Sequence, residues 1–287
     1  MKITAKYLLV ALLACSAGAV QAYHDNNYDY ANESRGCCFS SCYECGCNPL
    51  YCGAWDLQIH GGVNPITWRH RGFIYFTACT DFPTDPLRTI GNIQKFNHFF
   101  KTPWIVGGQV GYHWSDNARV YVEFNYSQAK GKDAVTLFDI DSAIPFVVSS
   151  NKYKLFDAYV GARYYWDRWC DRVSFFLGGK VGLTHHKSVE STIFVVGALD
   201  APVIGNPFVS STVVSGGADF GFDVCFCGNW SFVVTGGVIA SCGPASNDLA
   251  ITLVPSTIEV PEPTIALFGH IGTELRFPVT AGIRYSF

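Results

Sequence analysis

Cysteine thiols are the side chains of this sequence with the most evident chemistry. Of the 12 cysteines in 287 residues, half are crowded into one segment, RGCCFSSCYECGCNPLYC. Thiols this close in sequence either form disulfides or bind a metal as thiolates. Neighbouring cysteines cannot all pair locally with good disulfide geometry, so some of these thiols are expected to pair elsewhere. The cluster comprises Cys37, Cys38, Cys42, Cys45, Cys47 and Cys52.

Two alternatives are open for this cysteine cluster. It can fold as a small knob stapled by its own disulfides, with one inert thiol left over. The spacing Cys42-x-x-Cys45 with Cys47 beside it also suits zinc, but no second pair of Cys or His follows at the usual distance. We expect neither a metal nor a cofactor.

Residues 1–22 have the pattern of a secretory signal peptide. Lys2 and Lys6 precede an apolar run, and small residues ending at Ala22 form a cleavage site. Cleavage before Cys15, with lipidation of that thiol, is the alternative. Loss of residues 1–22 removes two of the 20 basic residues and none of the 23 acidic ones. The remaining balance gives no reason to expect nucleic acid as a partner.

The rest of the chain has the pattern of β-structure. Beyond the signal peptide no stretch approaches the roughly 18 continuous apolar residues of a membrane helix. If the chain spans a bilayer, it must therefore do so as a closed barrel. Period-two alternation and turn residues predict eight strands. They are residues 54–63, 104–114, 118–128, 152–166, 172–185, 213–226, 229–240 and 275–287.

The links between the predicted strands alternate strictly between short and long. Residues 115–117, 167–171 and 227–229 are tight turns, whereas the other links are much longer. Short periplasmic turns and long outer loops are typical of outer-membrane barrels. The long links contain further strand-like runs, which we interpret as hairpins above the membrane, with ten or more spanning strands as the alternative. These runs are residues 72–77, 134–138, 192–196 and 250–254.

The positions of the tryptophans separate a membrane barrel from a soluble sandwich, because alternation alone fits both. Trp55, Trp114, Trp166 and Trp230 all fall at the short-turn ends of predicted strands, on the apolar face. A ring of this kind is the aromatic girdle of a barrel at the membrane interface. The sequence therefore predicts an all-β class and an antiparallel, up-and-down transmembrane β-barrel of eight strands.

The last predicted strand, LRFPVTAGIRYSF, resembles the C-terminal targeting signal of bacterial outer-membrane barrels, with Tyr285 and Phe287 as the insertion signal. In topology, residues 54–287 resemble the eight-stranded OmpA-type barrel. The resemblance implies recognition by the barrel-insertion machinery and a place among the lipids of a Gram-negative outer membrane, after Sec-type export. The expected organisation is a signal peptide (1–22), a cysteine-rich periplasmic segment (23–53) and the barrel (54–287).

An even number of strands places both ends of the barrel chain, and hence the cysteine cluster, on the periplasmic side. Cys170, Cys225 and Cys227 fall on the same side, which makes nine thiols there and leaves at least one for another chain. Cys79 and Cys242 lie in outer loops, where they are able to bridge one another.

A cysteine-rich barrel of this kind resembles the major outer-membrane proteins of chlamydial-type bacteria. That resemblance implies disulfide cross-links to other cysteine-rich envelope proteins or to a second copy, and activity as a porin or an adhesin. We expect the outer loops to bind a host surface or an envelope protein, because loops on a rigid scaffold carry function.

The polar faces of the strands predict what fills the barrel. An eight-stranded barrel is just wide enough for side chains to fill it, and opposite charges inside would pair and close it. Inward glycines such as Gly107, Gly161 and Gly178 would leave room for water, so a narrow porin for small solutes is the alternative. The predicted lumen charges are Glu123, Arg163, Lys180, Asp219, Asp223 and Arg284.

Catalysis has little support in the sequence. Only His185, His186 and Ser188 form a suggestive group, and adjacent residues on a strand point to opposite faces. The chain contains no GxSxG, HExxH or phosphate-binding glycine loop. We therefore expect no enzyme, with a lipid-modifying activity as the weaker alternative.

Overall fold

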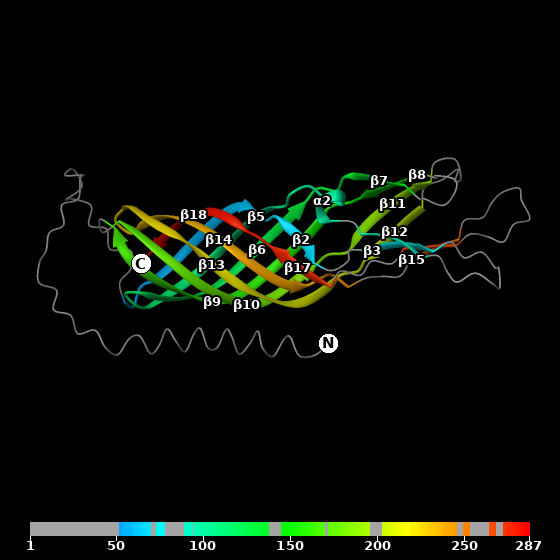
Figure 1. The fold of residues 1–287 in the computed structure, drawn as a ribbon. Coiled ribbons are helices and arrows are strands. Elements are labelled where there is room, and N and C mark those ends of the chain that lie inside the picture. Colours follow the sequence, from blue (N-terminus) through cyan, green and yellow to red (C-terminus); the bar gives the residue numbers. More distant parts are fainter. Residues whose placement is uncertain are drawn as a thin grey trace, which may run out of the picture.

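A computed structural model of the chain shows an antiparallel β-barrel (Figure 1). The predicted signal peptide, Cys79, Cys170 and the cysteine cluster up to residue 51 lie outside the described residues. The structure describes residues 52–69, 73–77, 89–93, 95–137, 145–169, 172–195, 203–245, 249–252, 264–267 and 272–287.

Eight chain crossings close the barrel, as the sequence predicts. Each crossing pairs antiparallel with its neighbours in chain order, and the last pairs with the first. The crossings are formed by β1 (Trp55–Val63), β5 (Trp104–Ser115), β6 (Ala118–Ala129), β9 (Tyr153–Trp169), β10 (Val173–His186), β13 (Ser211–Cys227), β14 (Trp230–Cys242) and β18 (Val279–Ser286).

The first and last crossings are each interrupted by a proline. After β1 the chain passes Pro65 and continues as β2 (Ile66–Arg69), while β17 (Thr273–Arg276) is followed by Pro278 and β18. The two breaks face one another, because the register resumes on their far side as β2 paired with β17. The predicted continuous strand over residues 275–287 is therefore wrong at this point. Proline has no N–H to donate to the ladder.

The two ends of the barrel differ in the way the crossings are connected. At the short-turn end, links of only two or three residues follow β5, β9 and β13, and the start of β1 meets the end of β18. At the opposite, long-loop end, the chain makes long excursions beyond the barrel (Figure 1). The described residues contain no helix that is both long and apolar enough to cross a membrane.

Two of the long excursions join into one sheet outside the barrel. Strands β8 and β11, which come from different excursions, pair with each other and make the sheet continuous. Its order is β12 (Val203–Phe208), β11 (Val189–Val195), β8 (Pro145–Ser150) and β7 (Asp133–Leu137). Two further hairpins are formed by β3 (Phe73–Thr77) with β4 (Thr89–Ile93) and by β15 (Leu249–Thr252) with β16 (Thr264–Leu267). The strand-like runs predicted in the long links are therefore hairpins and not extra crossings.

The outer wall of the barrel is apolar. Alternate residues of every crossing point outward, and side chains such as Ile59, Phe124 and Val160 are more than 60% exposed. Aromatic rings border this belt at both rims. At the short-turn end Trp55 lies 5.1 Å from Tyr112 and Trp230 lies 4.7 Å from Tyr285, between ring centroids. At the long-loop end Tyr126 links Trp104 and Phe156, with centroids 5.3 and 4.9 Å apart.

Candidate functional site

The interior of the barrel is the polar region of this molecule. The residues that alternate with the apolar wall point inward, and in the described part they bring together five cationic side chains and six carboxylates that are all buried. The cations are Arg119, Arg163, Lys180, Arg276 and Arg284, and the carboxylates are Asp56, Glu123, Asp157, Asp219, Asp223 and Glu274. Burying so many charges is tolerable only if they are paired and hydrogen-bonded.

Near the short-turn end, Asp56 of β1 holds the guanidinium of Arg119 on β6. Arg119 Nε donates to Asp56 Oδ2 over 2.7 Å, and its Nη1 donates to Gln109 Oε1 over 3.0 Å. His113 Nε2 lies 3.1 Å from the same carboxylate. In the neighbouring part of the lumen Arg284 lies 2.7 Å from Asp223.

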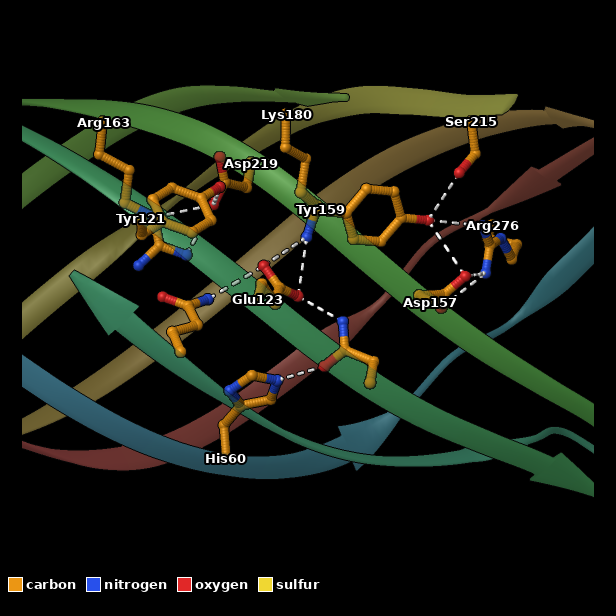
Figure 2. Close-up of polar contacts among 12 residues, drawn as sticks. His60, Tyr121, Glu123, Asp157, Tyr159, Arg163, Lys180, Ser215, Asp219 and Arg276 are labelled. Atoms are coloured by element: carbon orange, nitrogen blue, oxygen red, sulfur yellow. Dashed lines mark hydrogen bonds and ion pairs between the residues drawn. The ribbon is translucent and has the colours of Figure 1, made fainter. Parts of the chain in front are cut away.

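In the middle of the barrel Asp219 of β13 binds Arg163 of β9 (Figure 2). Two guanidinium nitrogens donate to Asp219 Oδ2 over 2.8 and 2.6 Å, and the Tyr121 hydroxyl donates to the same oxygen over 3.1 Å. The guanidinium carbon lies 4.7 Å from the centre of the Tyr121 ring and 4.4 Å from that of Phe176. Contacts with ring faces add to the ion pair in fixing the position of this arginine.

Glu123 of β6 is the centre of a second group (Figure 2). Lys180 Nζ donates to both of its oxygens over 3.1 Å, and Gln109 Nε2 donates to one of them over 3.0 Å. The amide of Asn125 also donates to Glu123, and its oxygen lies 2.8 Å from His60 Nε2. Because Gln109 also accepts from Arg119, this group is continuous with the pair at the short-turn end.

Toward the long-loop end Arg276 of β17 binds Asp157 of β9, over 2.8 and 2.9 Å. The same guanidinium donates to the Tyr159 hydroxyl, which also contacts Asp157 (Figure 2). It also donates to the Thr184 hydroxyl, which in turn donates to Asp157. Glu274, two residues before Arg276, accepts from the Tyr153 hydroxyl over 2.7 Å. Interlocking polar contacts of this kind therefore occupy the described lumen along most of its length.

Two apolar groups accompany the charged network. Tyr165, Phe176 and Val233 form a buried cluster inside the barrel, where the Phe176 ring packs on Arg163. At the long-loop end the short helix α2 (Phe96–Phe99) places Phe96 within 5.1 Å of Trp68 and 5.3 Å of Tyr153, between ring centroids. We call the second group the aromatic lid, and it consists of Trp68, Phe96, Phe100, Tyr153 and Phe208.

The inward glycines do not hold water-filled space, and this corrects the interpretation made from the sequence. A Cβ at Gly107 would overlap the Asn125 amide, and one at Gly178 would overlap Asp219. At both positions the place of the missing side chain is taken by a side chain that reaches across from a neighbouring strand. A cavity of about 10 Å³ remains in the middle of the lumen, which is roughly the space of one water molecule.

The residues that sequence analysis singled out for the lumen all lie inside it. Glu123, Arg163, Lys180, Asp219, Asp223 and Arg284 are buried and each has an opposite charge as partner. Sequence reasoning missed the other five of the eleven buried charges in the described lumen. Alternation alone was enough to find four of them, because they lie on the polar face of their strands: Asp56, Arg119, Asp157 and Arg276. The fifth, Glu274, precedes the predicted start of its strand.

The tryptophans predicted to form a girdle lie at the short-turn end and are exposed on the apolar wall. Trp55, Trp114, Trp166 and Trp230 are 45–51% exposed. Tyr285 and Phe287 stack there with centroids 6.3 Å apart. Phe287 also closes the seam of the barrel, since its backbone exchanges two hydrogen bonds with Trp55, over 2.8 and 3.1 Å.

The three residues considered for catalysis are not brought together. His186 is buried in the lumen, 2.9 Å from the Tyr153 hydroxyl, whereas His185 lies on the outer wall beside Thr212 and Ser210. Ser188 is exposed beyond the end of β10. Within the described ranges no three His, Cys, Asp or Glu side chains are grouped in a way that would hold a metal ion.

The described cysteines lie at both ends of the molecule. Cys52 is an exposed free thiol at the short-turn end, where its backbone N–H donates to Asp116 in the β5–β6 turn over 3.2 Å. Cys225 is buried, 3.5 Å from the carbonyl of Gly228, and Cys227 ends β13. Cys242 is an exposed free thiol at the long-loop end. The predicted Cys79–Cys242 pairing involves a residue outside the described part of the chain.

Comparison with known proteins finds distant similarities among solved structures. No protein-family model matches the chain, and neither does any curated protein. Among solved structures, the Neisserial surface protein A (NspA) is similar at 14% identity and a TM-score of 0.36, over 82% of this chain and 99% of that one. Ail, the attachment invasion locus protein of Yersinia pestis, has 12% identity and a TM-score of 0.34 over the same shares. The outer membrane protein OprG of Pseudomonas aeruginosa has 14% identity and a TM-score of 0.34, over 84% and 99%.

With identities and TM-scores this low, these similarities carry no argument about function. The chain itself has the fold of a closed eight-stranded antiparallel barrel with an apolar wall and a polar interior.

Proposed function

We propose that the protein is an outer-membrane barrel that does not conduct, and that it anchors a binding surface outside the cell. The distribution of side chains supports a location in the membrane, because it is the reverse of that in a soluble protein: apolar residues cover the wall and charges fill the interior. Both aromatic rims then lie at the two membrane interfaces. In this orientation the short-turn end faces the periplasm and the long-loop end faces outward.

The closed lumen is the observation that carries the anchoring role. Ion pairs follow one another from Arg284–Asp223 to Arg276–Asp157, and the aromatic lid covers the outer mouth. A solute would have to break buried ion pairs, each of which is costly to disrupt. Pore formation has no comparable support, because neighbouring side chains or backbone carbonyls occupy the space beside the inward glycines.

Planar-bilayer recording tests the closed lumen. The purified full chain should give no steady conductance, whereas the double variant E123A/K180A, which empties the middle of the lumen, should give small steps. Steady conductance of the unaltered protein would overturn the anchoring role in favour of a narrow porin.

The sheet outside the barrel supports the surface role. Strands β8 and β11 unite two loops into one structure that continues from the barrel wall, since Asn151 N–H donates to Glu190 and Lys187 N–H donates to Lys154. A surface held in this way has already lost most of its conformational entropy before a partner binds, so it suits recognition of a host surface or another envelope protein.

Excision of residues 138–144, between β7 and β8, tests the surface role. The variant should keep a folded barrel, but cells that display it should no longer adhere. Unchanged adhesion by that variant would remove support for the surface role.

A second candidate role is disulfide cross-linking in the periplasm. It is favoured by the position of Cys52, the last residue of the cysteine cluster, which is exposed at the short-turn end. A thiol held there faces the oxidising periplasm in the proposed orientation.

Non-reducing electrophoresis of isolated envelopes tests the cross-linking. It should show species larger than the monomer that disappear on reduction. The same species should be absent from a variant in which serine replaces all six cysteines of the cluster. Monomer alone under non-reducing conditions would count against cross-linking.

A further inference from the structure

The apolar wall carries a hollow near the long-loop rim. It measures about 520 Å³ and spans the outer faces of β6, β9 and β10. The register explains it: the small Ala158 has Phe124 and Leu183 as its two cross-strand partners. Those two side chains stand 62% and 51% exposed on either side of the alanine. The hollow is therefore shaped by side-chain size and is open to the hydrocarbon side.

Aromatic side chains border the hollow on its outer side. Tyr126 and Phe156 form the next outward-facing cross-strand pair, and their ring centroids are 4.9 Å apart. His185, the partner of Phe156 on β10, is held by hydroxyl groups: Thr212 Oγ1 lies 2.9 Å from its Nδ1 and Ser210 Oγ lies 3.2 Å from its Nε2. Aromatic and amphipathic rings of this kind mark the level of the membrane interface. The hollow thus begins where the hydrocarbon layer begins.

Lysines stand directly outside this aromatic row. Lys154 is the next outward-facing residue of β9 after Phe156, and the backbone N–H of Lys187 donates to its carbonyl over 3.1 Å. Lys187 Nζ lies 5.6 Å from the centre of the Phe156 ring. None of the lysines on this side of the rim has an ion-pair partner among the described residues. They are Lys101, Lys130, Lys132, Lys152, Lys154 and Lys187.

This concentration of positive charge is local. The chain as a whole has a formal charge of −3, and its buried cations are already paired in the lumen. The acidic residues that follow these lysines in sequence, Asp133 and Glu190, belong to strands β7 and β11 of the outer sheet. We call the row of lysines named above the basic arc. A row of unpaired positive charges above an apolar hollow is complementary to a lipid with an anionic headgroup.

From this arrangement we propose that the hollow and the basic arc form one binding site for a phosphorylated, acylated glycolipid of the outer leaflet. An acyl chain lies over Ala158 between Phe124 and Leu183, and a phosphate lies on Lys154 and Lys187. The arc runs across four neighbouring crossings, from Lys101 before β5 to Lys187 after β10, which is wide enough for more than one phosphate. The inference rests on the proposed orientation, because it places this rim in the outer leaflet.

Native mass spectrometry of the full chain in detergent tests the site, with lipid A as the probe. The unaltered protein should retain lipid A at low micromolar concentration. The variant K154Q/K187Q should bind roughly thirty-fold more weakly, at about five-fold for each lysine near a phosphate. A158F should also lose binding, because its ring fills the hollow.

Two matched variants and two further lipids give the controls. A162F places the same ring on the same outward face of β9, two repeats of the pleat farther from the rim, and should bind as the unaltered protein does. K95Q removes an exposed lysine before α2 that is not one of the two lysines assigned to the phosphate, and should also bind normally. Lipid A without phosphates should bind the unaltered protein as weakly as intact lipid A binds K154Q/K187Q.

Several results would overturn the proposal. Equal retention by A158F and A162F would show that the hollow is not the site, and equal retention by K154Q/K187Q would exclude the basic arc. Phosphatidylglycerol binding as tightly as lipid A would show a general anionic-lipid surface instead of a glycolipid site. Heat-modifiable migration in electrophoresis shows independently whether each variant has folded as a barrel. If the unaltered protein did not show this migration, the result would count against the proposed function and not against this site.

Discussion

At the scale of single residues, the stability of the barrel interior depends on buried charges that are tolerated only when each has a partner of opposite charge. Arg163 and Asp219 are both buried, and their attraction offsets the cost of removing two charges from water. The removal of one partner is then far more harmful than the replacement of both, because it leaves an isolated charge in a medium of low dielectric constant.

The substitution Arg163→Ala should lower the free energy of unfolding by about 3–5 kcal/mol, since it strands Asp219 inside the lumen. Urea titration of the barrel folded into lipid vesicles, followed by tryptophan fluorescence, measures this loss. The double variant R163M/D219L should recover most of it, because two apolar side chains of similar volume carry no charge to bury. A double variant as unstable as the single one would show that packing, and not charge pairing, is what these residues supply.

Glycine positions in the lumen should also be sensitive to substitution. A Cβ at Gly111 would overlap the guanidinium of Arg119 and force it away from Asp56, so Gly111→Ala should lower the free energy of unfolding by about 1–3 kcal/mol. Gly61 faces outward, and a Cβ there meets only the carbonyl of Ile105 at 3.5 Å. Gly61→Ala should therefore change stability by less than about 0.5 kcal/mol in the same urea titration. Equal effects at both positions would mean that Arg119 can move at little cost.

At the scale of elements, the seam between β1 and β18 decides whether the barrel closes. The two strands pair from Asp56 with Ser286 to Val63 with Val279, and Phe287 adds two backbone hydrogen bonds to Trp55 at the short-turn end. At the other end of the seam, Pro65 and Pro278 interrupt the ladder on facing strands. An unclosed seam would leave a row of unpaired backbone groups in lipid, which is costly.

Deletion of Phe287 should reduce the fraction of chains that reach the folded form, because it removes both hydrogen bonds to Trp55 and the ring beside Tyr285. The fraction is measured as heat-modifiable protein in isolated membranes. Phe226→Ala is the matched control, since this aromatic is exposed at the end of β13, away from the seam. Equal yields for the deletion and the control would show that Phe287 has no special part in assembly.

At the scale of the whole molecule, the two ends are chemically different. The short-turn end carries the tryptophan ring and Cys52, whereas the long-loop end carries the lysine arc, Cys242 and the sheet built from two loops. This asymmetry allows the orientation in the membrane to be measured with two thiols that are already present.

Variants that keep only Cys52 or only Cys242 should be labelled from opposite sides by a membrane-impermeant maleimide. With reductant present to release any disulfide, Cys242 should react in intact cells, because it is exposed at the long-loop end. Cys52 should react only after the outer membrane is permeabilised. Labelling of Cys52 alone in intact cells would reverse the orientation and would remove the basis of both the surface role and the lipid site.

The sequence by itself determined the features that follow from the period of two. Alternation and turn residues predicted eight crossings, the side on which Glu123 or Arg284 lies, and the short and long links, because strand geometry ties every second residue to one face. The proline breaks at Pro65 and Pro278 and the union of β8 with β11 were not predicted, since they depend on which strands meet across the barrel.

Only the tertiary structure decided what the barrel contains and how it closes. Alternation places Gly178 and Asp219 inside but says nothing of their distance, whereas the register sets them opposite one another and fills the space above the glycine with the carboxylate. The same holds for the outer wall, where Ala158 is an ordinary small residue until Phe124 and Leu183 are brought to either side of it. The period of two determines on which face of its own strand a residue lies. Its neighbours on other strands are determined only by the pairing of segments that are far apart in sequence.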